Sequence, residues 1–284
     1  MNEYNFDNKT FLVTGGTSGV GKATAIGLAQ KGARIVIVSR DGASSKKTLE
    51  EIAERTGNDK GEYLLADLSL HASVKQLAEE FKRKYDNLHV LANCAGALFP
   101  EMKMTADGFE RNFAINYMSH FWLTTNLLDI LQENGPSRII TVAGNPMFLK
   151  NAKINFDDLQ YTQKFSGFMA TGQAMYARLF FTFELAKRLQ GTNITANAFN
   201  PGVMKSNLAA NSAWYFKILA FLFKISEKDI CDVSTYLSTS DVIQNTSGKF
   251  FNKDRKVIPF HEDSDPKIGE RLWMMSEQLT ENIK

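Results

Sequence analysis

The sequence predicts an α/β fold: a single doubly wound domain with a seven-stranded, mainly parallel sheet and helices on both of its faces. Three observations predict it. The length of 284 residues suits one large α/β domain. Short β-branched runs alternate with helical patterns through most of the chain, which is typical of βαβ units. The first of these runs leads directly into a glycine-rich turn.

The expected elements follow one another in a regular order. Runs rich in β-branched and aromatic residues predict strands at 10–14, 34–39, 62–67, 89–93, 138–143, 194–199 and 248–252. Helical patterns lie between them, near 19–32, 44–56, 70–85, 105–133 and 166–190. No linker, internal repeat or low-complexity tract divides the chain, so we expect one domain over residues 1–284.

An aromatic-rich insertion at about 203–246 interrupts this order before the last strand. Ligands bind outside the carboxyl ends of the strands in open α/β sheets, so we expect the insertion to form a lid over a small apolar substrate. Its most apolar stretch, AWYFKILAFLFKI at 213–225, is too short to span a bilayer. Two alternatives stay open: packing on the sheet or on another subunit, and shallow membrane contact through Lys217, Lys224 and the neighbouring aromatic residues.

The composition argues against several classes of function. Lys and Arg total 33 against 31 Asp and Glu, so no basic surface for nucleic acid is expected. Two cysteines, Cys94 and Cys231, and four histidines show no metal-ligand spacing, so we expect no metal site. The N-terminal MNEYNFDNK is polar and lacks the apolar core of an export signal. The chain is therefore expected to be cytoplasmic.

The glycine-rich turn TGGTSGVGKA, residues 14–23, predicts a dinucleotide site. It places Gly15, Gly19 and Gly21 between the first strand and the first helix. Glycine permits positive φ and a close approach of the backbone to a pyrophosphate, which then meets the N–H groups of the helix. The expected contacts include the other residues of the turn: Thr17, Ser18 and Val20.

The end of the second strand predicts which dinucleotide binds. Ser39 and Arg40 stand where NAD-binding folds place an acid on the ribose 2′-hydroxyl. An arginine can instead pair with a 2′-phosphate and stack on adenine, which favours NADP(H). The alternative is that Arg40 is an ordinary solvated charge.

Further motifs carry a family resemblance. Asp67-Leu68, NCAG at 93–96, Asn116 in NFAINYMSHF and NPGVMKS at 200–206 follow the glycine turn in order. Together they resemble the short-chain dehydrogenase/reductase family over nearly the whole chain, and FTFELAKRL is most similar to its retinol-dehydrogenase-like group. The resemblance implies a Rossmann fold and these further cofactor contacts: Asp67, Leu68, Asn93, Ala95, Gly96, Pro201, Gly202, Val203 and Ser206.

The same resemblance implies that the catalytic set is replaced. The family uses a serine after the fifth strand and, on the next long helix, a tyrosine followed four residues later by a lysine. Aligning FTFELAKRL without a gap places Thr171 at the tyrosine position and Met175 at the lysine position, and RIITVAG places Gly144 at the serine position. No Tyr-x-x-x-Lys occurs elsewhere in the chain. Asn116 and Thr171 are the remaining catalytic candidates.

These replacements weaken the expected chemistry. A threonine hydroxyl is far less acidic than a phenol, and methionine offers neither charge nor donor, so standard ketoreductase activity should be weak or absent. Four side chains could substitute by residue type: Tyr176, Tyr161, His120 and Tyr117. Tyr176 is rotated about 100° around the helix from Met175 and is expected to face elsewhere, and a lone histidine such as His120 is expected to be structural. Thr171 itself or a bound water is the other alternative. Three hypotheses remain: an atypical enzyme performing altered redox chemistry or a non-redox cyclisation or isomerisation, a pseudoenzyme that binds or regulates, and an ordinary carbonyl reductase.

A homodimer is a further alternative. The resemblance implies that the two long helices near 105–133 and 166–190 are those through which relatives commonly dimerise. Phe180, Phe181 and Phe183 would then meet a second copy, or they belong to the core of one chain.

Overall fold

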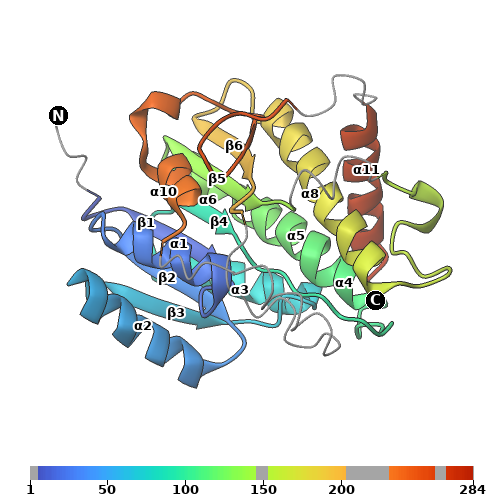
Figure 1. The fold of residues 1–284 in the computed structure, drawn as a ribbon, viewed down its shortest axis with the longest axis horizontal. Helices are drawn as coiled ribbons and strands as arrows, with labels where there is room; N and C mark the ends of the chain where they lie inside the picture. Colours follow the sequence, from blue (N-terminus) through green and yellow to red (C-terminus); the bar gives the residue numbers. More distant parts are fainter. Residues whose placement is uncertain (1–5, 145–152, 203–229, 260–266, 284) are drawn as a thin grey trace.

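A parallel sheet forms the centre of the molecule. The computed structural model describes residues 6–144, 153–202, 230–259 and 267–283. Its strands lie in the order β3-β2-β1-β4-β5-β6-β7, and every neighbouring pair is parallel (Figure 1). They are β1 (Thr10–Thr14), β2 (Arg34–Ser39), β3 (Gly61–Leu65), β4 (Val90–Asn93), β5 (Ser137–Val142), β6 (Ile194–Phe199) and β7 (Phe250–Phe251). The predicted Rossmann-like α/β fold is confirmed.

Helices cover both faces of this sheet. One buried cluster joins the sheet to α1 (Gly19–Ala29), α2 (Gly42–Thr56) and α10 (Asp232–Thr239). A second and larger cluster joins the opposite face to α3 (His71–Lys84), α5 (Ser119–Asn126), α6 (Leu128–Glu133) and α8 (Gly167–Arg188). The C-terminal helix α11 (Lys267–Glu281) packs against α8 (Figure 1). Strands covered from both sides explain the nearly continuous apolar runs of the sequence.

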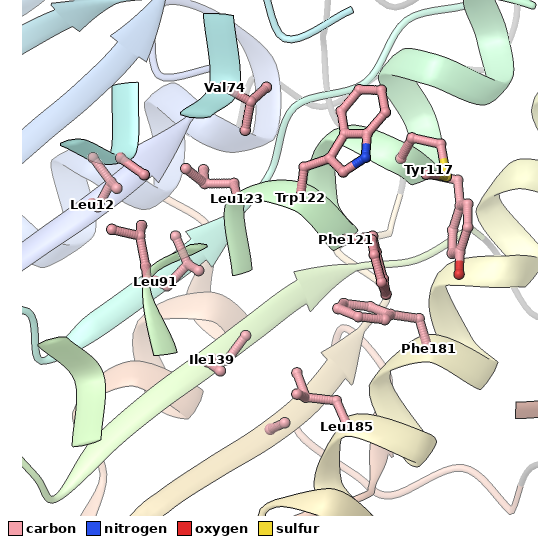
Figure 2. Close-up of a cluster of buried hydrophobic side chains, with 14 of the residues drawn as sticks. Leu12, Val74, Leu91, Tyr117, Phe121, Trp122, Leu123, Ile139, Phe181 and Leu185 are labelled. Carbon is pink, nitrogen blue, oxygen red and sulfur yellow. The ribbon is translucent and has the colours of Figure 1, made fainter. Parts of the chain in front are cut away.

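Aromatic side chains fill the larger core. Figure 2 shows Tyr117, Phe121, Trp122 and Phe181 gathered between the central helices and the sheet. Phe180 and Phe181 are only 4% and 1% exposed within a single chain. Of the two roles considered, the structure therefore shows core packing for Phe180 and Phe181, whereas Phe183 is only partly buried and its role stays a prediction.

The helix expected over 105–133 is wrong in detail. Residues 105–110 form a turn, and the helical part that follows is divided into α4 (Arg111–Phe113), the π-helix η1 (Ala114–Met118), α5 and α6. In the π segment, the N–H of Ser119 bonds to the carbonyl of Ala114. The carbonyl of Asn116 accepts a bond from the Arg178 side chain, an alternative to continuing the α-helical ladder. A long-range side-chain contact of this kind leaves no mark on local periodicity.

The described part of the insertion lies against the sheet. Its residues 230–246 contain α10 and the 3-10 turn η4 (Asp241–Ile243), and Val233 and Leu237 are buried beside α1. The stretch 213–225 lies outside the described residues, so its roles as lid, membrane contact or subunit interface stay predictions, as does cytoplasmic location. Among the described residues, no helix combines the length and the apolar character needed to cross a membrane.

Candidate functional site

The glycine-rich turn lies where the order of the strands reverses. The chain passes outward from β1 to β3 and then returns to β4 on the other side of β1, which creates the crevice where such folds bind ligands. The hydroxyl of Thr14 accepts hydrogen bonds from the N–H groups of Cys94 (2.9 Å) and Ala95 (3.0 Å). These bonds hold the glycine-rich turn and the NCAG turn side by side at the carboxyl ends of β1 and β4.

The N-terminus of α1 has the features of an anion-binding site. A Cβ added at Gly21 would lie 2.7 Å from the carbonyl carbon of Gly15 and 2.9 Å from the carbonyl oxygen of Thr14, so only glycine fits this close approach. Gly19, with φ of 52°, begins the helix. Ser18 at the N-cap makes no side-chain capping bond, and the first turn contains no acidic residue. The free N–H groups and the positive dipole end of α1 therefore suit a pyrophosphate.

The end of β2 presents a positive charge. Arg40 is exposed, and it makes no ion pair with any residue in the described ranges. The only adjacent acid, Asp41, caps α2 by accepting a 2.7 Å hydrogen bond from the N–H of Ser44. The N–H of Ser44 lowers the pKa of this carboxyl group. Ser39 bonds to Ser45 (2.6 Å) and to the backbone of Asp41, which fixes the turn that carries Arg40.

Other predicted cofactor residues have structural partners. Asp67 accepts bonds from the N–H and hydroxyl of Ser69 and so shapes the turn before α3. Asn93 is fully buried and donates to the hydroxyl of Thr124. The N–H of Gly202 bonds to the side chain of Asn200 after β6. The remaining members of the predicted set lie at the same edge or outside the described residues: Leu68, Pro201, Val203 and Ser206, of which the last two are not described.

Asn116 on η1 lies where that segment meets α8 and the residues after the NCAG turn, at the carboxyl edge of the sheet. Its Oδ1 accepts a 3.1 Å bond from the N–H of Ala97, and its Nδ2 donates a 2.7 Å bond to the carbonyl of the same residue. It therefore holds the segment after the NCAG turn in the manner of a paired strand. A Cβ at Gly96 would lie 3.0 Å from Asn116 Oδ1, so this packing also requires a small residue there.

Arg178 on α8 is the residue that sequence reasoning missed. Its side chain is buried, and its guanidinium donates to the backbone carbonyl of Asn116, to Asn116 Oδ1 (3.1 Å), to the carbonyl of Ala95 (3.0 Å) and to that of Val142 (3.1 Å). It thereby joins α8 to η1 and to the ends of β4 and β5. The sequence contains a pattern that indicates its burial, because Arg178 is the one charged residue of the apolar run AMYARLFFTF and stands at the spacing of the buried face of the helix.

Thr171 faces the protein interior. It is 4% exposed, and its hydroxyl donates a 2.9 Å hydrogen bond to Asn112 Oδ1. Asn112 is held in turn by Glu110, a fully buried carboxyl group that caps α4 and whose pKa is raised by burial. The hydroxyl proton of Thr171 is therefore directed toward Asn112. Met175 is partly buried one turn further along α8, and Gly144 lies partly exposed after β5.

The comparisons with known proteins decide the family. A family model for the short chain dehydrogenases matches residues 9–154, just over half of the chain. The chain belongs to the short chain dehydrogenase family. Polyprenol dehydrogenase of Homo sapiens is 32% identical over 283 residues, covering 96% of this chain and 85% of that protein. Retinol dehydrogenase 12 of Mus musculus is 34% identical over 274 residues, covering 95% and 86%. These relatives confirm that the chain is a retinol-dehydrogenase-like member of this oxidoreductase family.

Solved structures share the fold. The structure of an uncharacterized protein from Mycobacterium paratuberculosis has a TM-score of 0.75 and 28% identity, with 98% of this chain and 95% of that chain covered. A short chain dehydrogenase structure from Escherichia coli CFT073, complexed with NADPH, has a TM-score of 0.68 and 19% identity, with 89% and 99% covered. The family binds a nicotinamide cofactor, and the anion-ready start of α1 fits one.

Three of the side chains considered as substitutes are part of the core: His120, Tyr117 and Tyr176. His120 Nε2 donates a 2.9 Å bond to the carbonyl of Ala95, and burial together with Arg178 holds its pKa well below the usual range. The hydroxyl groups of Tyr117 and Ser276 bond to each other at 2.8 Å. Burial raises the pKa of Tyr117 and also that of Tyr176, which packs edge-on against Phe180. A phenol of raised pKa is a poorer proton shuttle at neutral pH.

Proposed function

We propose that the protein binds NADP(H) and acts on a small apolar substrate by a reaction that takes no proton from a tyrosine of the usual kind. The reaction is either a redox step on an activated substrate or a non-redox cyclisation or isomerisation. The single observation that carries the proposal is the inward direction of the Thr171 hydroxyl, which bonds to Asn112 at the position where family alignment places the tyrosine.

Arg40 supports the choice of NADP(H). Its guanidinium is exposed beside the turn that follows β2, while Asp41 is engaged as the cap of α2. A carboxylate free to bond a ribose 2′-hydroxyl would favour NAD(H), and a free guanidinium favours a 2′-phosphate. A structure of similar fold was solved with NADPH, which supports the same choice.

The relatives support the substrate class. Two of them are named for retinol and polyprenol, which are apolar isoprenoid alcohols. We therefore extend the proposal to an isoprenoid-like ligand. Met175, partly exposed at the position of the family lysine, would add apolar surface beside such a ligand.

A binding protein without turnover is the second candidate. The hydroxyl of Thr171 and the Nε2–H of His120 are both used in bonds to buried protein oxygens. Two of the possible replacement donors are therefore engaged inside the protein, and this observation favours a pseudoenzyme that binds nucleotide and ligand in a regulatory role.

The nucleotide proposal is tested by titration. NADPH and NADH are titrated into the purified protein by fluorescence, and we expect NADPH to bind at least about tenfold more tightly, a charge-assisted contribution of about 1.5–3 kcal/mol. Arg40→Gln should remove this preference. Lys31→Gln, an exposed charge beyond the far end of α1, is the matched control and should preserve it. Equal affinities, or binding of neither nucleotide, would overturn the proposal.

A further inference from the structure

Arg178 is a buried cation whose described partners are all uncharged. It is 1% exposed, and its four hydrogen bonds among the described residues go to the oxygens of Asn116, Ala95 and Val142. Burying a guanidinium without a carboxylate partner is costly, because neutral dipoles replace its hydration only in part. Burial lowers the pKa of Arg178 to about 9, so the side chain remains positively charged at neutral pH.

The neighbouring ionisable groups leave this charge unbalanced. Burial raises the pKa of the Cys94 thiol to about 12, so Cys94 is neutral. His120 shares the carbonyl of Ala95 with Arg178 and has a pKa well below its usual range, so it is neutral too. Among the described residues, Arg178 therefore contributes an unbalanced positive charge where α8 meets η1 and the ends of β4 and β5.

Arg178 lies at the carboxyl edge of the sheet, where folds of this kind bind a dinucleotide. Arg178 contacts the residues that end β4 and β5, and a Cβ at Gly96 would lie 3.2 Å from its Nη2. The anion-ready start of α1 lies beside the same NCAG turn, through the bonds of Thr14 to Cys94 and Ala95. A dinucleotide whose pyrophosphate lies at α1 extends along this edge.

Along α8, Arg178 stands three residues after the position at which family resemblance places a lysine. Family alignment places a lysine at position 175, which is methionine here, and position 178 lies on nearly the same face of the helix. Residue 175 is partly exposed, whereas Arg178 is buried and bonds to the carbonyls of Ala95 and Val142 at the ends of β4 and β5. A buried cation at this place makes no direct contact with a ligand in the crevice, and it would influence one only through space.

We propose that Arg178 makes the site bind the reduced cofactor, NADPH, more tightly than the oxidised cofactor, NADP⁺. The inference rests on the proposed NADP(H) binding. The two forms carry the same phosphates and differ in the nicotinamide ring, which is positively charged when oxidised and neutral when reduced. A fixed guanidinium at the carboxyl ends of β4 and β5 would repel the oxidised form and have little effect on the reduced one.

The size of the effect follows from Coulomb's law. In an effective dielectric constant of about 20, the interaction between two unit charges changes a binding constant by at least about tenfold at any separation up to roughly 12 Å. Removing the charge should therefore bring the two dissociation constants about tenfold closer together. The screening length in 0.15 M salt is about 8 Å for exposed charges, and a buried pair is screened much less, so the preference should persist at moderate salt.

The test is a pair of titrations on each of four proteins. Dissociation constants for NADPH and NADP⁺ are measured by calorimetry for the unmodified chain, Arg178→Gln, Arg178→Lys and Lys187→Gln. Lys187 is an exposed residue at the other end of α8, so Lys187→Gln removes one charge from the same helix far from the crevice. We expect NADPH to bind at least about tenfold more tightly in the unmodified chain, in Lys187→Gln and in Arg178→Lys. Arg178→Gln should lose most of this ratio.

The outcomes separate this inference from the proposed function. Binding of neither nucleotide to the unmodified chain would overturn both. Tight binding with equal constants for NADPH and NADP⁺ would overturn only the role of Arg178, as would an unchanged ratio in Arg178→Gln. If Arg178→Gln does not fold, Arg178→Lys decides: retention of the ratio supports a charge effect, and loss of it points to the geometry of the guanidinium and contradicts the inference.

Discussion

Replacing Gly21 by alanine should damage the nucleotide site through a clash that the structure locates. The new Cβ would lie 2.7 Å from the carbonyl carbon of Gly15 and 2.9 Å from the oxygen of Thr14. Nonbonded carbon atoms prefer about 3.5–4.0 Å, so the first turn of α1 must move by roughly 1 Å. Overpacking of this kind costs about 1–3 kcal/mol of folding free energy. The N–H groups directed at the pyrophosphate move with the helix.

The assay measures stability and binding in the same protein. Urea unfolding should show the stability loss, and NADPH titration should show a loss of affinity of at least about tenfold, because charge-assisted hydrogen bonds contribute about 1.5–3 kcal/mol each. Gly172→Ala is the matched control, since nothing lies within 4 Å of its added Cβ in the interior of α8. That variant should gain about 1 kcal/mol of stability. Wild-type NADPH affinity in Gly21→Ala would refute the reasoning.

Three further predictions follow from buried polar groups. Thr171→Val should cost about 1 kcal/mol in urea unfolding by removing the bond to Asn112, and an unchanged free energy of unfolding would contradict this buried bond. Tyr117→Phe should cost about 1 kcal/mol in urea unfolding, because the bond to Ser276 on α11 is lost, and no change would contradict the buried bond. Burial lowers the pKa of His89 from 6.5 to about 4, so the unfolded chain binds the extra proton between these values. Stability should fall by about 2 kcal/mol as the pH drops from 6.5 to 4, and His89→Gln should remove this slope.

The fold was predictable because the strands and the glycine-rich turn each have a recognisable local sequence pattern. Strands buried from both sides need continuous apolar runs, as in TFLVT, and the glycine-rich turn must leave room where α1 approaches β1. Such signals are local in the sequence, so reading along the chain was enough to place all seven strands. The assignment of Thr171 to the tyrosine position rests on the similarity of α8 to a known family, and it stays a prediction.

The details at the junction were not predictable in the same way. The division of the 105–133 helix around η1 and the choice of Arg178 as its partner arise between residues far apart in the chain. Hydrophobic periodicity places Arg178 on the buried face of α8, but it carries no information on which distant residue the guanidinium contacts. Nor could the sequence show that Thr171 donates inward, since this depends on the location of Asn112.

The central claim is that the residues expected to bind the dinucleotide are present, whereas the serine, tyrosine and lysine that handle the proton in the family are replaced. The most direct test mixes the unmodified protein, saturated with NADPH, with all-trans-retinal in a stopped-flow instrument and follows NADPH absorbance through a single turnover. The account predicts that NADPH binds, as detected by its fluorescence, and that its absorbance does not decay. Rapid oxidation of the bound NADPH, without substitutions at Gly144, Thr171 and Met175, would contradict it.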